Sequence, residues 1–105
     1  MTMKRDYAFY VYILSNPGRT VLYVGFTENM VRRLQGHIEN KGTKKSFAGK
    51  YNCTDIIYYE VYQYVNNAIA REKQLKRWSR SKKDDLIKQK NPSLRSLNRE
   101  FIITE

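Results

Sequence analysis

The sequence predicts an α/β (α+β) fold, in which a three-stranded antiparallel sheet is flanked by about three helices in the order β-β-α-β-α-α. Two strand-like segments rich in tyrosine flank a Pro-Gly turn signal, a third follows later, and other stretches carry apolar residues at helical spacing. With 105 residues, 41% of them hydrophobic, the chain is long enough for one compact domain and too short for two.

The first two strands are expected at residues 8–15 and 21–26, joined as a hairpin. Pro17-Gly18 suits the middle of a type II turn. A turn centred there would place Tyr12 directly opposite Tyr23, so that two phenols converge on one face. A two-residue type II turn splays the strands, so we expect a longer loop, and a slip of one residue would put the phenols on opposite faces.

A first helix is expected from Glu28 to about Asn40, with Thr27 as its cap. Its apolar side is formed by residues that recur every four positions: Met30, Leu34 and Ile38. Arg33 and His37 form their own i, i+4 pair on an adjacent face. This helix is therefore expected to carry both core residues and chemistry.

Residues 41–53 are rich in Lys and Gly, have no convincing period, and are predicted to form a mobile basic loop. A third strand is expected at 55–62. Asn66 or Asn67 then provides a cap for a second helix.

The second helix is expected from Ala68 to about Trp78. At 100° per residue, Glu72 lies inside its apolar side, between Ile69 and Leu75. A carboxylate is thus predicted to point inward.

Ser79 or Ser81 is expected to cap a shorter third helix, which Asn91-Pro92 ends. In the segment that follows, three apolar residues can dock on the sheet or helices: Leu94, Leu97 and Phe101. We therefore expect a single domain at residues 1–92 and a C-terminal tail at 93–105 that can pack on it.

The charge balance favours a polyanionic partner. Twenty Lys and Arg against ten Asp and Glu give a net charge of +10, which makes nucleic acid the leading candidate. No apolar run approaches the roughly 18 residues of a membrane span and no signal peptide is seen, so we expect a cytoplasmic protein without a membrane partner. We also expect the protein to be a monomer.

Metal chemistry is restricted by composition. Cys53 is the only cysteine and His37 the only histidine, which excludes an internal disulfide and a cysteine-cluster zinc site. Oxygen-bound Mg²⁺ or Mn²⁺ remains as the plausible class of metal.

Two tripeptides and the helix after them carry a resemblance. Tyr10-Val11-Tyr12 stands where the GIY-YIG nuclease family has Gly-Ile-Tyr, and Tyr23-Val24-Gly25 where it has Tyr-Ile-Gly. Arg33 and His37 follow at the family's intervals. Over residues 7–92 the chain resembles this family, and in particular its small stand-alone bacterial members, which are similar to the amino-terminal nuclease domain of the excision-repair incision subunit.

The resemblance implies a metal-dependent endonuclease that hydrolyses phosphodiester bonds in DNA, structure-specific or repair-related, with one divalent ion. The positions that match the family's catalytic residues are Tyr12, Tyr23, Arg33, His37 and Glu72, with Glu72 as the metal ligand. The late asparagine of many members has no secure counterpart; Asn91 is one match, while the repair-enzyme spacing points near Lys83 or Asp84.

These residues also suit the chemistry. A phosphodiester is anionic, and its transition state gathers more charge, which Arg33 and a metal on Glu72 can stabilise. Tyr23 could accept the proton of the attacking water, or Tyr12 and Tyr23 could orient water and phosphate. Making a free phenolate at neutral pH costs about 4 kcal/mol, a cost that neighbouring positive charge lowers. His37 is a second candidate because its ordinary pKa is near 6.5.

Several basic side chains are expected to contact the nucleic acid, with DNA favoured over RNA: Arg32, Lys44, Lys45, Lys50, Lys73, Lys76 and Arg80. Charge runs of this kind are usually only solvated surface. Two alternatives therefore stay open, namely a nucleic-acid-binding module with weak or lost nuclease activity, and an accessory domain that recruits a protein partner.

Overall fold

A computed structural model describes residues 8–44 and 46–102. In chain order its elements are β1 (Phe9–Ser15), β2 (Leu22–Thr27), α1 (Met30–Glu39), α2 (Phe47–Lys50), β3 (Asp55–Tyr62), α3 (Val65–Arg77), α4 (Arg80–Lys90) and a 3-10 turn (Asn98–Glu100). The strands form one antiparallel sheet in the order β2-β1-β3. The expected fold class is confirmed, with α2 as an additional short helix.

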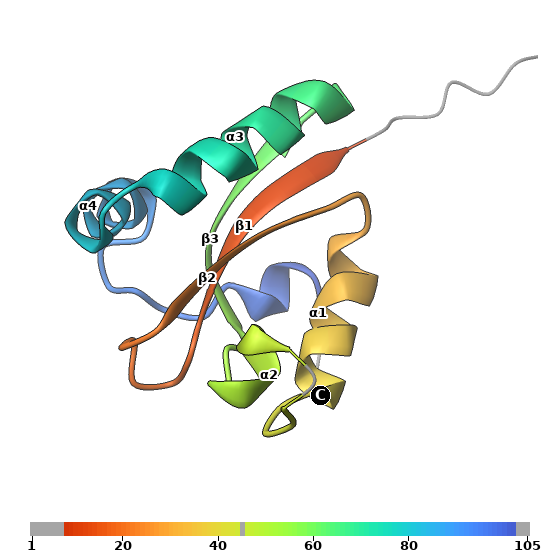
Figure 1. Ribbon diagram of the computed structural model, residues 1–105, viewed down its shortest axis with the longest axis vertical. Coiled ribbons are helices and arrows are strands. Elements are labelled where there is room, and N and C mark those ends of the chain that lie inside the picture. Colours follow the sequence, from red (N-terminus) through yellow and green to blue (C-terminus); the bar gives the residue numbers. More distant parts are fainter. Residues whose placement is uncertain (1–7, 45, 103–105) are drawn as a thin grey trace, which may run out of the picture.

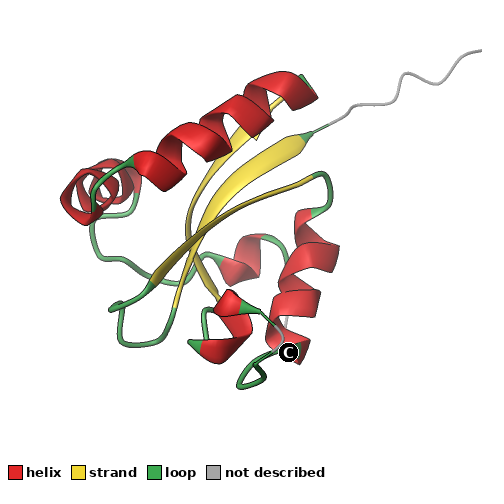
Figure 2. Ribbon diagram, in the orientation of Figure 1, coloured by secondary structure: helices red, strands yellow, loops and turns green. Residues whose placement is uncertain are grey.

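Helices cover both faces of the sheet (Figure 1). Val11 and Ile13 point to the face covered by α3 and α4, where they pack with Leu75 and Ile87. Tyr12, Leu14 and Ile56 point to the other face, where they form a second core with residues of α1 and α2: Met30, Leu34 and Ala48. Figure 2 shows the strands enclosed between these two helical layers. The alternation of β1 therefore decides which side chains meet α1.

The hairpin register differs from the simplest expectation. Tyr12 pairs with Gly25, and Tyr23 pairs with Leu14, so the phenols are not directly opposite. The loop is longer than two residues because the Asn16 side chain accepts hydrogen bonds from the backbone N–H groups of Thr20 and Val21, at 2.9 and 3.0 Å. The resulting shift is two residues, which keeps Tyr12 and Tyr23 on the same face.

Helix α1 begins later and turns its core side differently than predicted. Asn29, not Thr27, is the N-cap, and its side chain accepts from the N–H of Arg32. Ile38 is 44% exposed, whereas His37 is 7% exposed. The reason is geometric: at 100° per residue His37 lies about 20° from Met30, but Ile38 lies about 80° away. The predicted core position at Ile38 is therefore wrong.

Two further boundaries are corrected. The loop predicted at 41–53 contains α2, whose N-cap Ser46 accepts from the N–H of Gly49. Helix α3 begins at Val65 with Tyr64 at its N-cap and no side-chain cap, so the cap predicted at Asn66 or Asn67 is wrong. The predicted cap of α4 at Ser79 is confirmed.

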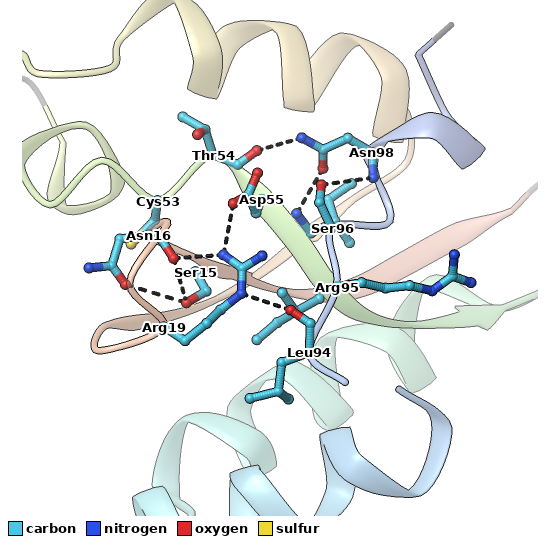
Figure 3. A network of polar contacts seen from close by, with 12 residues as sticks. Ser15, Asn16, Arg19, Cys53, Thr54, Asp55, Leu94, Arg95, Ser96 and Asn98 are labelled. Atoms are coloured by element: carbon cyan, nitrogen blue, oxygen red, sulfur yellow. Dashed lines mark hydrogen bonds and ion pairs between the residues drawn. The ribbon is translucent and has the colours of Figure 1, made fainter. Parts of the chain in front are cut away.

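The C-terminal segment is bound to the start of β3 and to the hairpin loop. Asn98 accepts from the N–H of Ile56 and donates to the carbonyl of Thr54, both at 2.8 Å. Arg19 joins the loop to this segment by donating to the Leu94 carbonyl at 2.8 Å, and it forms an ion pair with Asp55 at 2.7 Å (Figure 3). Within this segment, Leu97, Phe101 and Ile102 pack on the core of the α1 face, whereas Leu94 packs on the core of the α3 face.

Candidate active site

Tyr12 is the centre of the candidate site. It lies on the central strand and is 0% exposed, and its ring covers Gly25 on β2. A Cβ atom at Gly25 would lie within 3.0 Å of ring atoms of Tyr12, closer than real side chains come. The glycine of Tyr23-Val24-Gly25 is therefore explained by packing, because it makes room for the phenol of the neighbouring strand.

Helix α1 brings two side chains to this phenol. The Tyr12 hydroxyl lies 3.0 Å from Nε2 of His37, and Nε of Arg33 donates to it at 3.3 Å. Arg33 and His37 are one turn apart, so a single helix face presents both to the same oxygen. The predicted i, i+4 pair is thereby brought together with the first motif tyrosine.

Tyr23 completes the cluster from the edge strand. Its ring centroid is 6.5 Å from that of Tyr12 and 5.5 Å from that of His37. Contacts with the phenols of Tyr12 and then Tyr23 raise the pKa of Arg33. Four of the five predicted catalytic residues thus converge.

Burial sets the charge states of the inner groups. It raises the pKa of Tyr12 to about 12, against an opposing effect of Arg33. Burial, reinforced by the charge of Arg33, lowers the pKa of His37 to about 4. At neutral pH, Tyr12 is a neutral phenol and His37 a neutral imidazole, so the ordinary pKa that suggested His37 for proton transfer does not hold here.

Glu72 comes from α3, on the other layer. Its carboxylate is among the groups that raise the pKa of Tyr12, so its charge reaches the cluster. The side chain is 20% exposed and pairs with Lys76 at 3.5 Å. The inward carboxylate predicted from the helix pattern is therefore half-buried, and a lysine one turn later already neutralises it.

A cleft of about 490 Å³ opens beside the cluster. Its walls include the predicted residues Tyr23, Arg32, Arg33 and His37. Sequence reasoning did not assign to the site the other lining residues, which are Thr27, Glu28, Asn29, Gly36, Asn40 and Ser46. Three of them are cap residues, Asn29 and Asn40 of α1 and Ser46 of α2. Helix-capping signals are therefore the sequence feature that could have indicated these three residues.

The predicted nucleic-acid contacts fall into different settings. Arg32 lines the cleft, and four other predicted contacts are exposed, namely Lys44, Lys50, Lys73 and Lys76. Arg80 uses its guanidinium within the protein, donating to the carbonyls of Arg19 and Thr20 at 2.7 and 2.8 Å. Lys45 lies outside the described residues.

A metal ion would have few protein ligands. Across residues 8–44 and 46–102, no group of three or more His, Cys, Asp or Glu side chains could hold one. Glu72 alone fits Mg²⁺ because this ion usually keeps several waters and takes one or two carboxylates together with substrate phosphate. Asn91 has another role: its buried amide donates to the carbonyls of Ile57 and Arg95, both at 2.9 Å.

Within the described part of the chain, no helix has the length and apolar character needed to span a bilayer.

Comparisons with known proteins agree with the motifs. Residues 8–85 match the GIY-YIG catalytic domain. The chain is 37% identical over 83 residues to a UPF0213 protein of Syntrophus aciditrophicus. The matched region covers 79% of this chain and 92% of the relative. The chain is 33% identical over 89 residues to a UPF0213 protein of Pediococcus pentosaceus, with 85% and 90% covered.

A solved structure is also similar. The solution NMR structure of a UPF0213 protein from Bacillus halodurans has a TM-score of 0.51 and 28% identity, covering 80% of this chain and 86% of that one. The resemblance read from the two tripeptides is confirmed. The chain belongs to the GIY-YIG catalytic domain family, a nuclease superfamily.

Proposed function

We propose that this protein is a divalent-metal-dependent endonuclease that hydrolyses phosphodiester bonds in DNA. The observation that carries the proposal is the meeting of the Arg33 guanidinium with the phenols of Tyr12 and Tyr23 at the wall of a cleft. Such a cleft can hold a phosphate beside a fixed positive charge and beside the phenol of Tyr23, which is able to hydrogen-bond to water.

Arg33 stabilises the charge of the phosphate. Among the described residues no carboxylate forms an ion pair with it, so its charge is not neutralised within the site. The hydrogen bond from its Nε to Tyr12 fixes the guanidinium before substrate arrives. Charge that is fixed in advance lowers the cost of charge growing on the phosphate oxygens.

The two tyrosines have different roles: Tyr12 orients its neighbours and Tyr23 contacts the attacking water. The oxygen of Tyr12 already lies between Arg33 and His37, and with a pKa of about 12 it stays protonated and orients its neighbours. Tyr23 lines the cleft, so it is the phenol that meets the attacking water and either accepts its proton or orients it. His37 holds Tyr12 rather than serving as the base.

Glu72 is the proposed ligand of one Mg²⁺ or Mn²⁺ ion. A bound divalent ion supplies positive charge for the phosphate and the leaving oxygen. A single carboxylate, shared with Lys76, predicts weak metal binding until substrate phosphate completes the ligand set.

The partner we propose is DNA, bound by a monomer mainly through phosphates. The net charge of +10 and the exposed lysines support this. Affinity is expected to fall steeply as salt rises, because cations on the protein displace counterions from the backbone.

The test is cleavage of labelled duplex, single-stranded and branched DNA by wild type and Glu72→Ala, with Mg²⁺, Mn²⁺ or EDTA. Metal-dependent cutting that is lost in Glu72→Ala and kept in Asp85→Ala is expected. Asp85 is a matched control because its carboxylate is exposed on α4. Wild-type protein that cuts none of the substrates with either metal would overturn the proposal.

One observation favours a second candidate, a nucleic-acid-binding module with weak or lost nuclease activity. Glu72 is paired with Lys76 instead of standing free for an ion. Salt-sensitive binding of DNA without cleavage under any metal would support this alternative.

A further inference from the structure

A row of three aromatic rings extends from the candidate site onto α2, and the outer two rings are exposed. Tyr23 and Phe47 stack with centroids 6.2 Å apart at an interplanar angle of 24°, and Phe47 meets Tyr51 at 4.7 Å. Phe47 is 51% exposed and Tyr51 39% exposed. We call these three residues the aromatic ridge. It starts at the cleft wall, because Tyr23 lines the cleft.

The ridge is held in place by its short helix. Ala48 is 1% exposed, and its carbonyl accepts from the N–H of Cys53 at 2.8 Å. A Cβ atom at Gly49 would lie within 3.0 Å of the carbonyl oxygen of Asn40, so this glycine lets α2 pack closely against the end of α1. Phe47 and Tyr51 flank these two anchored residues, and their exposure is built into the fold.

Positive charge surrounds the rings. Nζ of Lys50 lies 5.3 Å from the centroid of Tyr51, and Lys44 is exposed just before α2. Arg32 and Arg33 line the cleft in which the ridge begins. Aromatic faces next to cations that can follow a phosphate backbone are the usual make-up of surfaces that bind single-stranded nucleic acid.

We propose that the aromatic ridge stacks unpaired bases of a nucleic-acid strand whose phosphate enters the cleft. The bases of an intact duplex are already stacked on each other and offer no free face, so the ridge would favour single-stranded or locally unpaired substrates. This inference rests on the proposed function, since it names the substrate class of the same cleft, but it can be tested without cleavage.

The test measures binding in EDTA with a labelled single strand and a duplex of equal length. Phe47→Ala is expected to weaken binding of the single strand by about 10-fold and of the duplex by less than about 2-fold, as expected for the loss of one stacked base. A 2-aminopurine placed in the strand should lose fluorescence when the strand binds to wild type. The loss of fluorescence should be much smaller with the double variant that combines Phe47→Ala and Tyr51→Ala.

Tyr64→Ala is the matched control. Tyr64 is 65% exposed and occupies the N-cap position of α3, which lies on the opposite face of the sheet from α2 (Figure 1). Its loss should leave both affinities unchanged. Phe47→Trp should keep the preference for the single strand. If Phe47→Ala does not fold by circular dichroism, Phe47→Leu replaces it, since Leu keeps an apolar contact with Tyr23 but has no aromatic face.

The inference is overturned if Phe47→Ala binds the single strand as wild type does, or if single strand and duplex weaken equally. Because these readings need no metal, they separate from the proposed function. If the wild-type protein quenches 2-aminopurine but never cuts DNA, the proposed nuclease activity is wrong and base stacking on the aromatic ridge stands. If it cuts DNA but shows no preference for the single strand, base stacking on the ridge is wrong and the proposed nuclease activity stands.

Discussion

Each face of the sheet carries a cluster of two tyrosines and one arginine, and the two clusters differ in what completes them. On the α3 face, the Glu60 carboxylate accepts from Tyr58 and Tyr62 and takes two hydrogen bonds from Arg71, at 2.9 and 3.0 Å. On the α1 face, Arg33 meets Tyr12 and Tyr23, and the partner completing that cluster is the neutral His37.

The carboxylate makes the difference. Hydrogen bonds from Arg71 and the two phenols lower the pKa of Glu60 despite its burial, so that cluster is a closed and neutralised network. Among the described residues, no carboxylate forms an ion pair with Arg33 in the α1 cluster, so that cluster keeps its positive charge and opens into a cleft. The same residue types thus form a stabilising hydrogen-bond network on one face and a candidate anion-binding site on the other.

The strongest way to break this comparison is Arg33→Ala. Cleavage under single-turnover conditions is expected to fall by about 100-fold or more, because a fixed charge on the phosphate is typically worth about 3 kcal/mol. The melting temperature should change little, since Arg33 is exposed and forms no ion pair among the described residues. Cleavage at the wild-type rate would remove Arg33 from the site.

Arg71→Ala should have the opposite profile. It leaves the Glu60 carboxylate, 12% exposed, without its cation, and is expected to lower the free energy of unfolding in urea by about 2 kcal/mol. Cleavage per folded molecule should stay at the wild-type level. Adding Glu60→Gln to Arg71→Ala should restore part of the stability; a double variant no more stable than Arg71→Ala would contradict the closed network.

The two clusters should also separate by pH. His37 has a pKa of about 4 in the folded protein and near 6.5 when unfolded. The unfolded chain therefore binds more protons between these values, and stability is lost as pH falls from about 6.5 toward 4. Between pH 7 and pH 4.5 the loss should be about 2 kcal/mol.

His37→Gln isolates that effect, because Gln can hydrogen-bond to Tyr12 but does not titrate. Glu60 contributes in the opposite cluster: its lowered pKa adds stability that is lost only as pH falls below the ordinary value of a carboxyl group. Urea unfolding of both proteins across this range gives the difference. Parallel pH profiles for wild type and His37→Gln would count against the buried neutral imidazole.

The smallest effect is expected from Lys76→Ala. The ion pair with Glu72 is 3.5 Å long, and the Lys76 side chain is 53% exposed, so its loss should change the free energy of unfolding by less than about 0.5 kcal/mol. Differential scanning calorimetry beside Arg71→Ala makes the contrast direct. A loss of stability as large as that caused by Arg71→Ala would mean that the ion pair of Glu72 stabilises the fold as much as that of Glu60.

The strands and the meeting of the site residues were largely predictable from sequence. The third strand has the predicted bounds 55–62, because its apolar, aromatic run is interrupted on both sides. The face shared by Tyr12 and Tyr23 was also predicted, although the register was off by two residues. A shift of two preserves the face, and only the side-chain bonds of Asn16 reveal the longer loop.

The remaining errors have local physical causes. A four-residue helix such as α2 is too short to show a period, so residues 47–50 read as loop. Whether His37 or Ile38 is buried depends on a helix rotation of about one residue. Hydrophobicity favours Ile38, but burial of His37 is compensated by the hydrogen bond between its imidazole and the Tyr12 hydroxyl. The pairing of Glu72 with Lys76 has the i, i+4 spacing at which such pairs form on a helix, so the sequence permits it, but spacing alone does not decide between that pair and an inward carboxylate.

The strand order β2-β1-β3 bears on how the protein forms during synthesis. Tyr12, Tyr23, Arg33 and His37 all leave the ribosome early, but β1 acquires its second neighbour only when β3 has emerged. We therefore expect nascent chains ending before residue 62 to be protease-sensitive throughout, with protection of the hairpin arising only in longer ones. Protection of the hairpin in the shorter chains would show that it folds without its third strand.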